Sequence, residues 1–310
     1  MLSRPAAARW PPIHHAASLL GAIQVFNDFI QPYEGQTDEA FRAALYAGTV
    51  LVLPSSETTL RMRDHCWDRV CQVFGDDPRN ASKRLSGDQL FQKAGLLRRE
   101  FYESDVCRQG IADLLRQTGC DSIQHLCDPV RLRVITEGGH HNPAAAPVYY
   151  AHRDTWYSNP QCQITWWMPL HPVSKSETFS FLPFYFDRAV DNDSGGFDYR
   201  QWTSKGTDLK IGWQDAEAGR RELYPRLRES LPQAQRIAFE AQAGEVIVFS
   251  GQHLHQTVPI ESGETRLSID FRTVCLPDHD KGWGPKNVDN RSTGDALAGH
   301  IPVSPADRGP

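Results

Sequence analysis

In the first third of the chain, apolar residues recur every three or four positions, the spacing of amphipathic helices. Thr37 is followed by two acidic residues, and Ser55 or Ser56 can cap a second helix. The expected helices start at Thr37, run from Ser56 to about Phe74, and cover about 87–99 and 107–117. The apolar, β-branched run 48–54 ends at a proline and predicts one strand among them.

From Val130 onward the pattern changes to short β-branched and aromatic runs that are separated by Gly, Pro, Asn and Ser. Such runs are typical of strands joined by turns. The expected strands cover 132–136, 148–152, 162–168, 179–182, 245–249, 253–259 and 266–272. A long polar insert, 187–233, interrupts them and is expected to hold a helix near 215–230.

Helices followed by closely spaced strands predict an α+β chain built around an antiparallel barrel or jelly roll. A barrel of about eight strands can hold one small ligand in its mouth. Because barrels and sandwiches of this length are commonly one domain, residues 1–310 are expected to form a single domain. Its expected parts are a mainly helical support (1–129) that starts with a Pro-rich arm (1–36), a catalytic core (130–275) and a loop-rich tail (276–310).

Composition excludes several classes of protein. The net charge of −5 argues against a general nucleic-acid binder, which would carry a basic excess. The sequence has no apolar run of 18 residues, which predicts no membrane span, and its N-terminus lacks the apolar region of a secretion signal. Seven scattered cysteines without a CxxC pair fit reduced thiols. We therefore expect a cytoplasmic monomer or homodimer whose partner is a small molecule.

The candidate chemistry starts at His152 and Asp154, at the end of the strand expected over 148–152. Residues i and i+2 of a strand project from one face, so the imidazole and the carboxylate can reach one point. An Fe(II) site of two histidines and one carboxylate needs one more histidine. His253 and His255 are both candidates, and strand alternation cannot choose between them because they have the same parity.

Taken together, these features resemble the iron(II)/2-oxoglutarate-dependent dioxygenases, and most closely the branch that includes phytanoyl-CoA dioxygenase. The resemblance rests on the His152-x-Asp154 pair, on the segment His255-Gln256-Thr257-Val258-Pro259, and on Arg266 eleven residues after His255. It covers about half of the chain. It implies a double-stranded β-helix (jelly-roll, cupin-like) core with flanking N-terminal helices, and it selects His255 over His253 as the second histidine.

The same resemblance implies the cofactors and the roles of the residues. His152, Asp154 and His255 would bind Fe(II), with 2-oxoglutarate and O2 as co-substrates. Arg266 would hold the far carboxylate of 2-oxoglutarate, because a planar guanidinium matches a carboxylate with two hydrogen bonds. Further candidates for contact with the co-substrate are Thr257, Ser268, Gln163 and Thr165.

Candidate substrate contacts are Tyr150, Trp156 and Arg272, and core packing is the alternative for Trp156. The insert 187–233 is expected to cover the mouth of the barrel. The implied activity is oxidation, most simply hydroxylation, of a small-molecule metabolite or natural-product intermediate, with release of succinate and CO2. One alternative is a cupin-type isomerase or oxygenase that does not use 2-oxoglutarate and has no need of Arg266. Another is a jelly roll that binds a ligand without catalysis, which an intact triad disfavours.

Overall fold

The computed structural model describes residues 29–142, 145–204 and 224–304. Its large sheet has seven strands in the order β1-β2-β7-β4-β9-β3-β10, and a small sheet has the order β6-β5-β8. The large sheet contains β1 (Ile30–Pro32), β2 (Val50–Leu53), β3 (His125–Ile135), β4 (Ile164–Pro169), β7 (Val246–Ser250), β9 (Arg266–Cys275) and β10 (Ile301–Pro302). The small sheet contains β5 (Phe179–Phe181), β6 (Ile237–Ala238) and β8 (His255–Thr257). The α+β class is confirmed.

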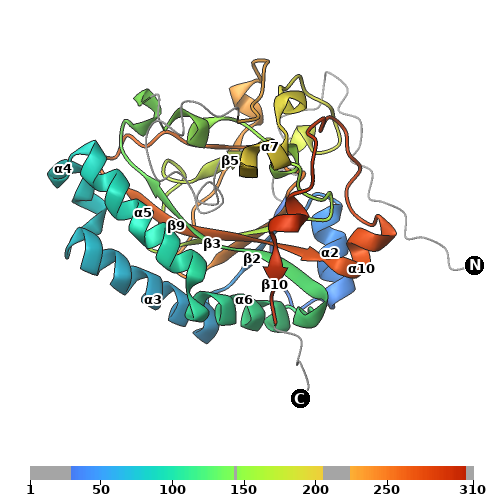
Figure 1. The fold of residues 1–310 in the computed structure, drawn as a ribbon, viewed down its shortest axis with the longest axis horizontal. Coiled ribbons are helices and arrows are strands. Elements are labelled where there is room, and N and C mark those ends of the chain that lie inside the picture. Colours follow the sequence, from blue (N-terminus) through green and yellow to red (C-terminus); the bar gives the residue numbers. More distant parts are fainter. Residues whose placement is uncertain (1–28, 143–144, 205–223, 305–310) are drawn as a thin grey trace, which may run out of the picture.

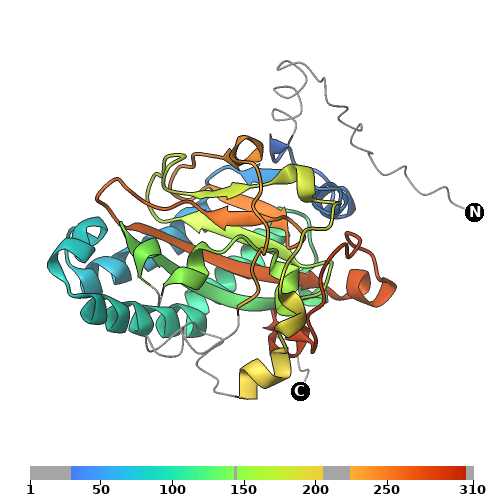
Figure 2. The ribbon, with the colours of Figure 1, turned by 90° about the horizontal axis from the view of Figure 1, so that it is seen from above.

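The helices α3, α5 and α6 lie along one face of the large sheet (Figures 1 and 2). The helices within the described ranges are α2 (Asp38–Tyr46), α3 (Glu57–Phe74), α4 (Ala81–Arg84), α5 (Gly87–Glu103), α6 (Asp105–Gln117), α7 (Tyr199–Ser204) and α10 (Leu276–Lys281). Thr37 caps α2, and Ser56 and Ser86 form capping boxes on α3 and α5, which explains where these helices begin. Their apolar faces bury residues such as Met62 and Leu97 in one core with Leu132 and Ile269 of the sheet.

A second apolar core joins the large sheet to the small one. Trp167 of β4 and Phe249 of β7 pack with Phe179 and Phe181 of β5. The large sheet therefore lies between the helices on one face and the small sheet on the other. The space beside this second core holds the candidate site.

The strand expected over 148–152 is wrong. Residues Ala146–Tyr149 form a 3-10 turn (η4) with a proline near its start, because the fixed φ of Pro147 favours helical geometry. His152 makes only an isolated bridge with His255, and Asp154 begins another 3-10 turn (η5, Asp154–Tyr157). The pair therefore does not lie on one continuous strand.

The tail is more ordered than expected. It forms α10, a 3-10 turn (η9, Ala296–Gly299) and β10, which pairs with β3. The helix expected near 215–230 falls partly on the range 205–223, which the structure does not describe. Residues 224–230 are described, and they are not helical. The arm expected over 1–36 falls mostly on residues 1–28, also outside the described part. Its described end includes β1, which pairs in parallel with β2.

The sequence predicts reduced cysteines. All seven lie in the described part of the chain, and each is a free thiol. No described helix combines the length and the apolarity needed to cross a membrane.

Candidate metal centre and its cavity

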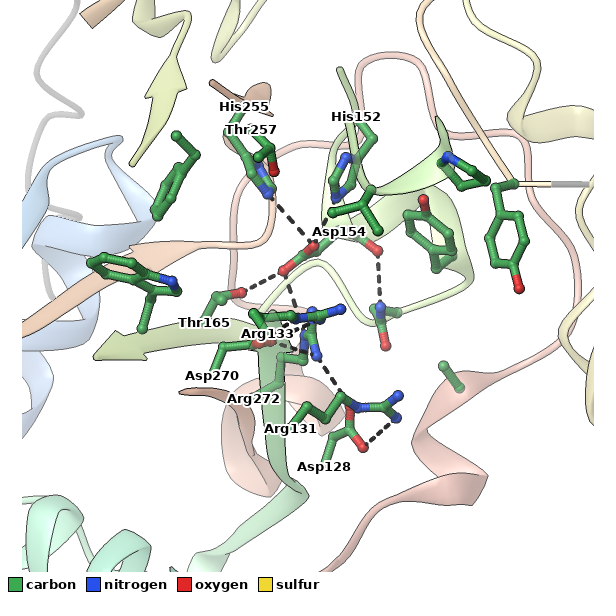
Figure 3. A pocket seen from close by; sticks show the side chains of 18 of the residues that line it. Asp128, Arg131, Arg133, His152, Asp154, Thr165, His255, Thr257, Asp270 and Arg272 are labelled. Carbon is green, nitrogen blue, oxygen red and sulfur yellow. Dashed lines mark hydrogen bonds and ion pairs between the residues drawn. The ribbon is translucent and has the colours of Figure 1, made fainter. Parts of the chain in front are cut away.

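Three side chains converge at the edge of the small sheet: His152, Asp154 and His255 (Figure 3). Each offers one ligand atom, and these atoms lie within 4.8 Å of one another. The Nε2 atom of His152 is 3.6 Å from Oδ1 of Asp154, and Nε2 of His255 is 4.0 Å from the same oxygen. Among the described residues, this group is the one whose donor atoms could hold a metal ion together.

The backbone brings the two histidines together without a regular strand. His152 and His255 exchange both hydrogen bonds between their N–H and C=O groups, each 3.0 Å long. Residues paired in this way carry their side chains on the same face. Gly251 allows the close approach of Asp154, because a Cβ at this glycine would lie 3.0 Å from Nε2 of Gln163 and 3.4 Å from the Asp154 Cβ.

Hydrogen bonds to the backbone fix the tautomer of both imidazoles. Nδ1 of His152 lies 2.8 Å from the carbonyl oxygen of Tyr150, and Nδ1 of His255 lies 3.0 Å from that of His253. A carbonyl can only accept, so each Nδ1 carries the proton and each Nε2 keeps a lone pair for a metal. Burial lowers the pKa of His255 to about 4, so this imidazole is neutral at pH 7, the form that binds metal.

The Asp154 carboxylate is held in place by its second oxygen. Oδ2 accepts a hydrogen bond from the Thr165 hydroxyl at 2.6 Å and from Nε2 of Gln163 at 3.2 Å. Burial by itself would raise the pKa of Asp154, but the guanidinium of Arg272 and the two histidines hold that pKa well below its usual range. The carboxylate is therefore anionic, and Oδ1 is directed at the histidines.

Gln163 and Thr165 thus orient the carboxylate, whereas the sequence pattern predicts contacts with the co-substrate. Both lie next to Asp154, and the Thr165 side chain also lines the cavity. Gln163 is fully buried and is not among the cavity-lining residues. Their direct contact with a co-substrate stays a prediction.

His253 differs from His152 and His255 in its hydrogen bonding and in its neighbours. It is fully buried, its Nε2 has no hydrogen-bond partner among the described residues, and it packs against the rings of Phe29, Phe181 and Phe186. His253 lies in the turn before β8, which begins at His255, so strand alternation does not place its side chain on the same face as that of His255. Of the two candidates, His255 is the one that the fold places in the triad.

A cavity of about 270 Å³ surrounds the triad, and one part of it extends from His255 toward Arg266. We call this part the Arg266 side; its members are Trp167, Phe179, Phe249, Thr257 and Arg266. The His255 ring packs at 5.3 Å from Phe249 and 5.7 Å from Phe179, and Phe179 packs at 5.3 Å from Trp167. Arg266 lies over Trp167, 5.8 Å from the ring centre.

Arg266 is a buried cation with hydrogen-bonding capacity to spare. It is only 3% exposed. Nη1 donates to the carbonyl oxygen of Glu177 at 3.4 Å, while the buried Nε has no hydrogen-bond partner in the described part of the chain. Burial lowers its pKa to about 10, which leaves it charged at pH 7. Ser268 does not line the cavity. Its hydroxyl accepts a hydrogen bond from Nε1 of Trp167 at 3.1 Å.

Charged side chains of β3 and β9 form the floor of the cavity (Figure 3). Arg272 pairs with Asp270 at 2.9 Å and with Asp128 at 3.5 Å. Arg133 pairs with Asp270, and Arg131 with Asp128 at 2.8 Å. Polar residues stand at every second position from Arg266 to Arg272 of β9, and this pattern indicates that the face is not an ordinary core, although it does not identify the partners. Arg272, expected to contact substrate, therefore already has carboxylate partners.

A second part of the cavity extends from His152, and we call it the ring side. Its members are Tyr157, Phe197, Tyr199, Trp202 and His300. They come from η5, from the insert and from the tail, so three separate segments build one wall. None of the five was predicted by name, because no local pattern marks residues that meet only after folding, although the insert 187–233 was expected to cover the mouth.

Tyr150 and Trp156, the other expected substrate contacts, do not line this cavity. Tyr150 lies under the guanidinium of Arg226 in a separate surface depression. Trp156 is fully buried, and its Nε1 donates to Asp289 at 2.8 Å, so it packs in the core. The Tyr150 expectation depended on two-residue alternation with His152, which the η4 turn removes. Trp156 lies in the η5 turn, and its core packing is the alternative that the sequence left open.

No protein-family profile and no curated protein matches this chain. EvdO2 from Micromonospora carbonacea var. aurantiaca, also solved with 2-oxoglutarate, is 12% identical with a TM-score of 0.44 over 77% of this chain and 91% of that one. The non-heme alpha-ketoglutarate-dependent carbocyclase SnoK from nogalamycin biosynthesis is 16% identical with a TM-score of 0.39 over 89% and 96%. The epimerase SnoN, in complex with Fe3+, alpha-ketoglutarate and nogalamycin RO, is 12% identical with a TM-score of 0.38 over 76% and 84%. Because these TM-scores are below 0.5, the assignment of function depends on the geometry of the site.

Proposed function

We propose that this chain is a non-haem Fe(II)- and 2-oxoglutarate-dependent oxygenase that oxidises, most simply hydroxylates, a small molecule and releases succinate and CO2. The observation that carries the proposal is the convergence of His152, Asp154 and His255 at a cavity that also holds the buried cation Arg266. Two imidazoles and one carboxylate are the donor set of oxygenases that keep metal positions open for substrates.

The donor atoms fit Fe(II). Two Nε2 lone pairs and the Oδ1 atom of Asp154 face one point, and hydrogen bonds on the opposite atom of each side chain orient all three. These outer contacts fix ring orientation and increase ligand basicity. When bound, the iron and 2-oxoglutarate supply the oxidising chemistry, while the chain supplies orientation and a dry cavity.

The Arg266 side fits the co-substrate. A dicarboxylate reaching from the metal into this side would end in an apolar pocket formed by Trp167 and Phe179, beside a guanidinium whose Nε has no partner among the residues that the structure describes. Such a buried donor needs an acceptor, and a carboxylate supplies two oxygens in the geometry of the guanidinium fork. The Thr257 side chain lines the same side and offers its hydroxyl.

Strand connectivity supports a double-stranded β-helix as the core. From β3 to β9 the chain passes repeatedly between the sheets: β3, β4, β7 and β9 belong to the large one, and the His152 bridge, β5, β6 and β8 to the small one, with β5 and β6 as the one consecutive pair in the same sheet. Alternation of this kind is typical of jelly rolls, in which two sheets share one core. The triad then lies at the open edge between the sheets.

Replacing Arg266 with alanine is expected to raise the KM for 2-oxoglutarate by about 10- to 100-fold, because a charge-assisted hydrogen bond contributes roughly 1.5–3 kcal/mol. The measurement is succinate release in the presence of Fe(II) and O2. Arg99→Ala is the matched control, since Arg99 is exposed and does not line the cavity. An unchanged requirement for 2-oxoglutarate in Arg266→Ala would assign this arginine to another ligand. Failure of the wild-type protein to release succinate, with or without added substrates, would contradict the proposed function itself.

A further inference from the structure

The ring side forms a continuous chain of aromatic contacts that starts at the metal centre. Tyr157 packs edge-on to the ligand His152 at 5.4 Å, and Phe197 packs edge-on to Tyr157 at 5.5 Å. Trp202 follows at 6.0 Å from Phe197, with Tyr199 at 5.9 Å from Trp202. All four rings line the cavity rather than fill it. Aromatic walls of this kind favour a flat ring, which can pack against their faces and edges.

Two polar atoms in this wall have no partner within the described part of the chain. They are Nε2 of His300 and Nε1 of Trp202, and both are buried. Most buried polar atoms are satisfied in folded proteins, so an unsatisfied pair beside a cavity points to a missing ligand. Its chemistry can be deduced from what each atom offers.

His300 offers an acceptor. Its Nδ1 lies 3.0 Å from the carbonyl oxygen of Ala296, which can only accept, so Nδ1 carries the proton. Burial lowers the pKa of His300, so the ring is neutral at pH 7 and Nε2 presents a lone pair. The natural partner of that lone pair is a hydroxyl hydrogen. Trp202 offers the opposite, because an indole N–H can only donate and needs an oxygen acceptor.

The fold holds these groups at fixed positions. β10 follows His300 directly and pairs with β3, whose residues form the floor of the cavity. Phe197 is held from the tail as well, since its carbonyl accepts from the N–H of Thr293 at 2.9 Å. The insert and the tail therefore brace each other around the ring side.

Resting on the function proposed above, we infer that the ring side binds the primary substrate, and that this substrate is a flat ring compound with a hydroxyl group that donates to His300 and an oxygen that accepts from Trp202. An unbranched hydrocarbon chain satisfies neither atom and offers no flat face to the aromatic wall. The inference names a class, hydroxylated aromatic or quinone-like rings, and assigns His300 and Trp202 as residues that determine specificity.

The test uses three small probes with the full chain: 2-naphthol, 2-methoxynaphthalene, which keeps the ring but cannot donate, and 2-decalol, which keeps the hydroxyl but is not flat. Binding is measured by calorimetry on metal-free protein and on protein loaded anaerobically with Fe(II) and 2-oxoglutarate. We expect 2-naphthol to bind about 3- to 10-fold more tightly than either analogue, the effect of one buried hydrogen bond or of ring packing.

Variants then assign the preference to residues. His300→Phe keeps a ring and is expected to bind 2-naphthol and 2-methoxynaphthalene equally. Trp202→Phe is expected to weaken binding of both oxygen-bearing naphthalenes by about 3- to 10-fold. His279→Phe is the matched control, because His279 is exposed and outside the cavity, and it should behave as the wild type.

Absence of probe binding, an equal affinity for 2-decalol, or a preference that survives in His300→Phe would overturn the inference. The same loaded samples are examined for the visible band of an Fe(II)–2-oxoglutarate complex. If that band forms while the ring preference is absent, the substrate class is wrong and the proposed function stands. If metal-free protein selects 2-naphthol but no band forms, the ring side is supported and the proposed cofactors are wrong.

Discussion

Replacing Asp154 with alanine is expected to reduce Fe(II) affinity by more than about 100-fold and to abolish succinate release. The change removes the only carboxylate of the triad, and loss of an outer-shell partner alone typically costs ~10–100-fold in metal affinity. The fold should survive, because Arg272 keeps Asp270 and Asp128 as partners. Metal content after dialysis, succinate release and thermal unfolding together check this expectation.

The control for that experiment is Asp280→Ala, which removes an exposed carboxylate outside the cavity. It should keep wild-type iron content and turnover. A folded Asp154→Ala protein with wild-type iron content would show that the metal is bound elsewhere, and an active one would refute the triad.

Replacing Arg153 with methionine is expected to lower the free energy of unfolding by roughly 3–5 kcal/mol, the range for breaking a buried ion pair. Arg153 lies between two triad residues and is fully buried. Its Nε is 3.1 Å from both carboxylate oxygens of Asp289 in the tail. It also donates to the carbonyl oxygens of Gln252, Tyr185 and Arg188, at 2.6, 2.7 and 2.8 Å.

Arg153 thus joins the loop before His255, the start of the insert and the tail. Urea unfolding measures the loss of stability. Arg61→Met is the control, because its ion pair with Asp113 is exposed and should contribute less than about 1 kcal/mol. In the double variant Arg153→Met/Asp289→Leu, part of the lost stability should return, since no buried carboxylate is left without its cation. A loss as small as that of Arg61→Met would show that the network does not stabilise the site.

Local patterns in the sequence were sufficient for much of the fold. The capping residues Thr37 and Ser56 predict where α2 and α3 begin, since a cap is a property of a few adjacent residues. The apolar runs likewise predict β4, β7 and β9. The 148–157 segment was not predictable in the same way, because 3-10 turns there replace the strand that alternation requires.

The site was predictable only where it is local or resembles a known family. His152 and Asp154 are two residues apart, so the pair can be recognised directly in the sequence. His255 was selected as the third ligand by the resemblance to a known family. Partnerships such as Asp128 with Arg272 depend on the pairing of β3 with β9, far apart in the sequence. The contribution of His300 depends in the same way on how a polar tail folds back onto β3.

The most direct test of the central claim is an anaerobic titration of the protein with Fe(II) and 2-oxoglutarate, followed by visible absorption. We predict a weak charge-transfer band that is lost in His255→Leu and kept in His253→Leu, since only His255 lies in the triad. Iron that binds without producing the band, or a band that persists in His255→Leu, would contradict the account.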